Sequence, residues 1–138
     1  VRSGEAAQRF ERMIAELGGP HDLLAHSTRY LPCAPIIEPI FPVREGYVAD
    51  VDARAVGNVL VGLGGGRRVA GEVLDLAVGL SEVATIGAHV GRERPLAMVH
   101  ARSPEQVRQA ADALRAATSL SDSAVSPPPI IHEILVAA

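Results

Sequence analysis

The sequence predicts an α+β fold in which helices pack against a mainly antiparallel sheet. Helical segments and short β-prone runs alternate along the 138 residues without a regular βαβ rhythm. Hydrophobic residues make up 48% of the chain and charged residues 21%, which is ordinary for a globular protein. Because only 3% of the residues are aromatic, we expect a core built mainly from Leu, Val, Ile and Ala.

The chain begins with a predicted amphipathic helix. Ser3 is the expected N-cap, apolar residues recur at helical spacing as far as Leu17, and a Gly-Gly pair then ends the helix. Pro20 opens a short second helical segment over residues 21–25. Four prolines follow between residues 31 and 42, so any strand there is predicted to be an edge strand or to be bulged.

The middle of the chain contains a turn, a helix and a glycine run. Glu45 and Gly46 form a turn signal between β-prone runs at residues 40–43 and 47–51. Asp52 is the predicted N-cap of a helix over residues 53–63, and the glycines begin where that helix ends. Alternating apolar residues over 72–80 predict a strand.

The strongest helix start lies in the C-terminal half. A turn-rich link leads to a predicted strand over residues 96–101, and Ser103-Pro104-Glu105-Gln106 follows it. This tetrapeptide offers an N-cap serine, a proline at the first helical position and a glutamine that closes a capping box. Residues 121–129 are predicted to form a flexible, proline-rich linker, and residues 130–136 a last strand.

Charge and composition argue against several classes of protein. The net charge is −3, from 13 basic and 16 acidic residues, so the chain has no basic excess to attract nucleic acid. It also has few aromatic rings on which bases could stack. The single cysteine, Cys33, rules out an internal disulfide and suits a cytoplasmic protein. No apolar run reaches the roughly 20 residues of a membrane span, and no signal peptide is evident. The chain starts with Val1 close to a helix start, so we expect a piece of a longer protein.

The most unusual stretch is Gly64-Gly65-Gly66-Arg67-Arg68, which has the composition of a phosphate-binding loop. Such loops need the order strand, glycines, helix N-terminus, because the backbone N–H groups and the positive helix end face the anion. Here a helix precedes the glycines, and neither common phosphate-loop motif is present. Two interpretations stay open: a helix C-cap with a flexible loop, and a moving functional loop whose arginines bind an anion or carboxylate.

Other candidate residues form no complete site. Cys33 has no basic neighbour, and Asp50 with Asp52 more readily supplies a helix cap than a cation site. Ser81-Glu82 and residues 121–123 resemble caps or linkers rather than parts of a catalytic triad. The histidines lack the spacing of a zinc site, so we predict neither a metal site nor a catalytic residue. They are His21, His26, His89, His100 and His132.

Four stretches taken together resemble a known enzyme family. They are "AQRFERMIAELGGPHDLL", "YLPCAPIIEPIFPVREGYVADVDARAVG", "LGGGRRVAGEVLDLAVGL" and "IGAHVGRERPLAMVHA". In this order they resemble the C-terminal part of the thymidine phosphorylases, within the broader family of pyrimidine nucleoside phosphorylases. The resemblance runs from about Gly4 to Leu120.

The resemblance implies a fold, an activity and an assembly. It implies an α/β-hammerhead-like C-terminal domain over residues 31–120. A helical lead-in over 1–30, which belongs to a larger α/β domain, precedes it. A proline-rich linker and a terminal strand over 121–138 follow it. The family's enzymes convert thymidine and phosphate into thymine and 2-deoxyribose 1-phosphate. They act as homodimers that close a cleft between a helical and an α/β domain, and they need inorganic phosphate as co-substrate but no cofactor.

The resemblance carries no catalytic residue onto this chain, because the family's phosphate- and base-binding residues lie in preceding segments. This chain also contains no lysine. The stretch resembling residues 64–71 is a loop at the mouth of the cleft, which implies that Arg67 or Arg68 helps to hold the closed state. Residues 83–101 resemble half of a biotinyl-type barrel in shape only.

Several alternatives remain beside this interpretation. The chain can be a free-standing interaction module, a small anion-binding protein that uses Arg67 and Arg68, or part of a relative that acts on uridine or a nucleotide. As a piece of a phosphorylase it is expected to be a scaffold and cleft wall that is inactive alone. Its partners are then the preceding part of the enzyme, a second subunit and a small nucleoside.

Overall fold

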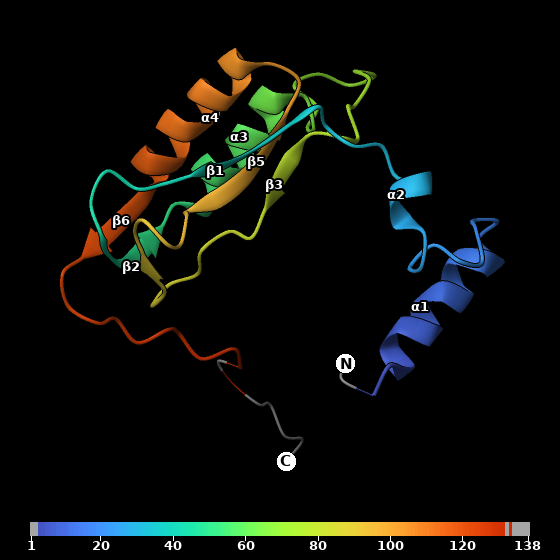
Figure 1. The fold of residues 1–138 in the computed structure, drawn as a ribbon, viewed down its shortest axis with the longest axis horizontal. Helices are drawn as coiled ribbons and strands as arrows, with labels where there is room; N and C mark the ends of the chain where they lie inside the picture. The colour runs from blue at the N-terminus through green and yellow to red at the C-terminus, as the bar shows by residue number, and fades with distance from the viewer. Residues whose placement is uncertain (1–2, 132, 134–138) are drawn as a thin grey trace. The chain divides into compact units, whose positions relative to one another are not determined.

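The computed structural model describes residues 3–131 and Glu133, and the chain divides into two compact units, Val1–Cys33 and Ala34–Ala138. The first unit contains helices α1 (Glu5–Glu16) and α2 (Ser27–Tyr30), shown in blue in Figure 1. None of the described residues of this unit is buried, so it has no core of its own.

Two sequence predictions in the first unit are wrong in detail. The N-cap of α1 is Gly4, at φ +81°, and Ser3 accepts only a long 3.4 Å hydrogen bond from the backbone N–H of Glu5. Residues 21–25 form turns, and the short helix lies later, at Ser27–Tyr30. The Asp22 carboxylate contacts both His26 and Tyr30, so this side chain ties the turns to the helix that follows.

The second unit contains two three-stranded sheets, and every strand pair in them is antiparallel. The first sheet has the order β1-β5-β3 and the second β4-β2-β6. The strands are β1 (Ile36–Ile40), β2 (Gly46–Val51), β3 (Gly79–Ser81), β4 (His89–Val90), β5 (Ala97–Ala101) and β6 (Thr118–Ser121). The prediction of an α+β fold with antiparallel pairing is confirmed, and β1, which carries Pro39, is an edge strand as expected.

Helices α3 (Ala53–Leu63) and α4 (Pro104–Ala117) pack on the first sheet and bury its core (Figure 1). Their apolar faces and alternate residues of β5 interdigitate there. The most deeply buried members are Leu63, Ala97, Val99, Ala101 and Leu114. As composition predicted, this core contains only aliphatic side chains.

Both predicted helix caps in this unit are confirmed. The Asp52 carboxylate accepts a 2.9 Å hydrogen bond from the N–H of Ala55, and the Ser103 hydroxyl accepts one from the N–H of Gln106 at 3.3 Å. The Gln106 side chain accepts from the N–H of Arg102 at 2.8 Å instead of from that of Ser103. The reciprocal bond of the predicted capping box therefore comes from the residue before the N-cap and not from the N-cap itself.

Other strand predictions need correction. The predicted strand over residues 72–80 shrinks to Gly79–Ser81, because the chain turns at residues 76–77, where the Asp75 carboxylate accepts from the N–H of Ala77 at 3.0 Å. Strand β6 was not predicted; it pairs with β2 across a bulge. The predicted strand over 130–136 lies mostly outside the described residues, and Ile130 and Ile131 are not in a strand.

Candidate functional site

The glycines and arginines lie on a loop whose two ends are joined. We call residues 64–75 the arginine loop; it leaves α3 and lies at the upper right of the second unit in Figure 1. The N–H of Asp75 donates to the carbonyl of Gly64 at 3.0 Å and closes the base of the loop. Compact loops of this length with adjacent ends are frequently functional.

The three consecutive glycines have different roles. Gly64 caps α3 at φ +97°, a left-handed conformation that favours glycine, and this confirms the predicted C-cap. A Cβ atom on Gly66 would lie 2.7 Å from Cγ2 of Val61 and 3.3 Å from its Cα, so close packing requires glycine there. A Cβ atom on Gly65 would make only ordinary contacts, the nearest at 3.5 Å.

The backbone N–H groups of the first two glycines are not available to bind a phosphate. The N–H of Gly64 donates to the carbonyl of Val61 at 3.1 Å, and the N–H of Gly65 donates to that of Leu60 at 2.9 Å. Both donors are used to end α3, at the negative end of its dipole. The argument from the order of the elements therefore holds in the structure.

The two arginines of the loop differ in what they contact. Nε of Arg67 donates to the carbonyl of Glu72 at 3.1 Å, so this guanidinium is tied inside the loop. The backbone N–H of Arg68 donates to the Glu72 carboxylate at 2.7 Å and lowers the pKa of that carboxyl. Among the described residues, no hydrogen bond or ion pair engages the Arg68 guanidinium.

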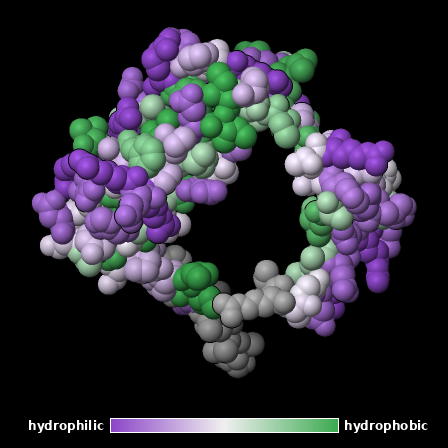
Figure 2. All heavy atoms as spheres, in the orientation of Figure 1, coloured by the Kyte–Doolittle hydropathy of each residue, from purple (hydrophilic) through white to green (hydrophobic). Residues whose placement is uncertain are grey.

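Apolar side chains also stand out from the loop. Val69 is 68% exposed and Val73 is 90% exposed, and Leu76 just beyond the loop is 77% exposed. Figure 2 shows apolar residues at the surface of this end of the unit. Within the described part of the chain, the loop thus presents the partnerless Arg68 guanidinium among exposed aliphatic side chains.

The base of the loop is held by the start of α4. Nε of Arg102 donates to Oδ2 of Asp75 at 2.7 Å, and its NH2 group donates to Oδ1 at 2.9 Å. The amide of Gln106 donates to the carbonyl of Leu63 at 3.2 Å, immediately before the loop. The Arg102 guanidinium, with help from the Ala77 N–H, lowers the pKa of Asp75 to about 2. Sequence reasoning missed this pair because its members are far apart in the chain.

The histidines are dispersed in the structure. Nδ1 of His26 lies 2.9 Å from Oδ2 of Asp22, a pair at i,i+4 spacing that the sequence could have revealed. His89 packs edge-on against the Tyr47 ring, with centroids 5.0 Å apart. His21 lies at the start of the turns of the first unit, and His132 lies outside the described residues.

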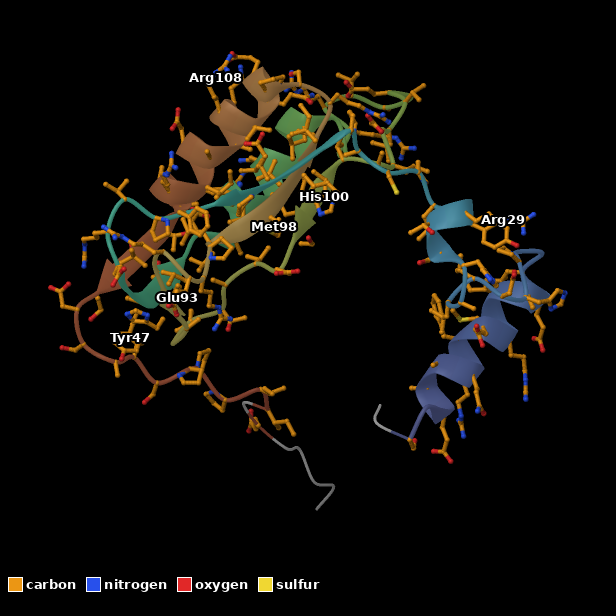
Figure 3. All side chains as sticks on the ribbon, in the orientation of Figure 1. Arg29, Tyr47, Glu93, Met98, His100 and Arg108 are labelled. Carbon is orange, nitrogen blue, oxygen red and sulfur yellow. The ribbon has the colours of Figure 1, made fainter. Side chains whose placement is uncertain are left out.

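One histidine contacts a hydroxyl across two strands. Nε2 of His100, labelled on β5 in Figure 3, lies 2.8 Å from Oγ of Ser81 on β3. Among the residues described, no hydrogen bond joins a carboxylate to this imidazole, so the contact is not a triad. No sequence spacing could have revealed the pair, because only the sheet register brings the two residues together.

The remaining candidates are isolated. Cys33 is exposed, and its thiol contacts only the carbonyl of Leu31, at 3.8 Å. Asp52 is occupied as a helix cap, and the Ser121 hydroxyl accepts from the N–H of Ser123. Over residues 3–131 and 133, no three His, Cys, Asp or Glu side chains gather to hold a metal ion.

None of the helices in the described part of the chain has the length and apolar character needed to cross a membrane. In a comparison with protein families, residues 47–121 match the pyrimidine nucleoside phosphorylase C-terminal domain. The match spans most of the second unit, including the arginine loop and both residues of the Asp75–Arg102 pair. It confirms the resemblance found in the sequence.

Proposed function

We propose a function from one premise: the chain belongs to the pyrimidine nucleoside phosphorylase family, whose C-terminal domain occupies residues 47–121. The chain is the C-terminal part of a cytoplasmic, homodimeric pentosyltransferase that converts thymidine and inorganic phosphate into thymine and 2-deoxyribose 1-phosphate. Phosphate is the co-substrate, and no cofactor takes part. The preceding part of the same enzyme supplies the catalytic residues.

The role proposed for the second unit is to form a wall of the substrate cleft and to help close it. The observation that carries this role is the arginine loop, which has a fixed base and an exposed Arg68 guanidinium. A loop that completes a site when it closes can control turnover without contacting the reacting atoms.

The first unit is proposed to pack on the larger α/β domain that precedes it. Helix α1 is amphipathic, yet Phe10 is 40% exposed, Met13 49% and Leu17 78%. An apolar stripe of this kind normally faces a core. The matched domain begins only at residue 47, which agrees with assigning this unit to the preceding domain.

Phosphate-dependent release of thymine from thymidine tests the proposal. The full-length enzyme and the 138-residue chain alone are assayed with and without phosphate, and with uridine in a parallel series. We expect release only from the full-length enzyme, only with phosphate, and faster from thymidine than from uridine. Phosphorolysis by the chain alone would contradict the supporting role, and faster cleavage of uridine would contradict the proposed substrate.

A further inference from the structure

We propose that Asp75, Arg102 and Gln106 are positioning residues that anchor both ends of the arginine loop to the start of α4. This inference rests on the proposed function for its consequence in catalysis. The anchoring itself follows from contacts within the second unit. It assigns a role to three residues on the basis of their contacts with the loop and with one another, and neither the sequence motifs nor the predicted caps single them out together.

The first anchor holds the end of the loop. The Asp75 carboxylate accepts two hydrogen bonds from one guanidinium, at 2.7 and 2.9 Å, and a third from the N–H of Ala77 at 3.0 Å. Arginine donates in a rigid planar fork, so a two-point contact fixes orientation as well as distance. Asp75 also bonds through its N–H to Gly64, which brings the start of the loop to the same place.

The second anchor holds the start of the loop. The Gln106 amide group donates to the carbonyl of Leu63 at 3.2 Å, while its oxygen accepts from the N–H of Arg102 at 2.8 Å. One side chain therefore links the last residue of α3 to the residue that binds Asp75. The two anchors share Arg102 and form one connected network at the N-terminus of α4.

Beyond these anchors the loop has little support. Its tip is held by a 3.4 Å contact between the N–H of Glu72 and the carbonyl of Val69, and by the bonds of Glu72 to the two arginines. A fixed base with a lightly held tip limits where the Arg68 guanidinium can go. This restriction reduces the conformational freedom that must be lost when the loop docks.

The same contacts add little to global stability. The Arg102 side chain is 49% exposed and that of Asp75 29%, and exposed ion pairs contribute little to folding. A local role therefore predicts a selective effect: loss of the pair should loosen the loop while the unfolding transition of the domain stays in place. A merely structural ion pair would not produce this separation.

Limited proteolysis of the full chain with trypsin tests the anchoring. The chain has no lysine, so every trypsin site is an arginine, and Arg67 and Arg68 lie on the loop itself. In Asp75→Asn we expect cleavage after these two residues to be about fivefold faster than in the unchanged chain. Arg102→Lys should give a smaller increase, because an ammonium cannot reproduce the two-point contact.

Asp112→Asn is the matched control. Its carboxylate, 84% exposed on α4, lies 3.6 Å from Arg115 and does not touch the loop. We expect this control to leave cleavage at Arg67 and Arg68 unchanged, and circular dichroism should show the same unfolding midpoint for all variants. Equal rates of cleavage in Asp75→Asn and Asp112→Asn would overturn the anchoring. Faster cleavage of Asp75→Asn accompanied by a lower unfolding midpoint would overturn it as well.

Kinetics of the full-length enzyme separate this inference from the proposed function. If the loop closes the cleft, Asp75→Asn should lower kcat/KM for thymidine about fivefold, in step with the faster cleavage. Faster cleavage with unchanged kinetics would support the anchoring and contradict the closing role of the loop. Altered kinetics without faster cleavage would overturn the anchoring.

Discussion

The carboxylate of Asp75 and the guanidinium of Arg102 form a two-point ion pair that joins the end of the arginine loop to the start of α4. The members are 27 residues apart in the chain and lie on separate elements. The pair gives the loop a fixed base, and its chemistry leads to the first of four predictions.

The ion pair should survive mild acid. Hydrogen bonds from Arg102 and then from the N–H of Ala77 lower the pKa of Asp75 from 3.8 to about 2. Because the folded pKa lies below the unfolded one, the small stabilising contribution of this solvent-accessible pair is present above about pH 4 and is lost as the pH falls from about 4 to about 2. An NMR titration of the Asp75 carboxyl carbon should have its midpoint near the lower value. A midpoint near pH 4 would show that the pair does not form in solution.

Of the two loop arginines, Arg68 should matter more for turnover. Its guanidinium has no partner among the described residues, whereas that of Arg67 is bonded to the Glu72 carbonyl. In the full-length enzyme, Arg68→Ala is expected to lower kcat/KM for thymidine by about ten- to a hundredfold, because it removes the guanidinium proposed to hold the closed state. Arg67→Ala should have a smaller effect.

Arg108→Ala serves as the control for this pair of variants. Arg108 lies on the exposed face of α4, where it pairs with Glu105 (Figure 3). Steady-state kinetics of the three variants should give Arg108→Ala the same kcat/KM for thymidine as the unchanged enzyme. Unchanged kinetics in Arg68→Ala and Arg67→Ala would remove the proposed role of both loop arginines.

Alanine should be tolerated at Gly65 and not at Gly66. A Cβ atom on Gly66 would lie 2.7 Å from the stiff side chain of Val61, whereas one on Gly65 meets nothing closer than 3.5 Å. We expect Gly66→Ala to lower the free energy of unfolding by about 1–3 kcal/mol. Gly65→Ala should change it by less than about 0.5 kcal/mol. Urea unfolding of the two variants tests this, and equal values would mean that the glycine run is required only for its flexibility.

Removal of the Asp52 cap should destabilise α3. Its carboxylate accepts from the N–H of Ala55, and Asp52→Ala should cost about 1 kcal/mol of unfolding free energy. Asp50→Ala is the natural control, because Asp50 is an exposed residue of β2 two positions away that caps no helix. If calcium or magnesium stabilised the unchanged chain but neither variant, the two carboxylates would instead form a cation site.

Residue patterns predicted the elements that depend on local chemistry. The caps at Asp52 and Ser103, the end of α3 at Gly64 and the edge strand with its proline all follow from bonds or clashes within a few residues. The glycine run was likewise placed correctly after a helix, an order that argues against a phosphate cradle. The helix predicted at residues 21–25 is misplaced, because these residues form turns and the short helix lies at Ser27–Tyr30.

Long-range contacts could not be predicted in the same way. Strand β6 has few apolar residues, and it is a strand because β2 offers it an open edge. The prediction of a strand over 72–80 is wrong because the Asp75 carboxylate binds Arg102 and accepts from the N–H of Ala77, where the chain turns. The Ser81–His100 contact depends on the register of two strands. In each case the deciding partner is distant in the chain.

The sequence by itself determined the class of fold, both ends of α3, the start of α4 and the aliphatic core, because each of these follows from composition or from residue types at short spacing. The family followed from the resemblance of four longer stretches taken together. Only the tertiary structure decided how the base of the arginine loop is held. The physical reason is that Asp75, Arg102 and Gln106 meet only after α3 and α4 pack on the same sheet. Packing of elements distant in sequence therefore set the geometry of the candidate site.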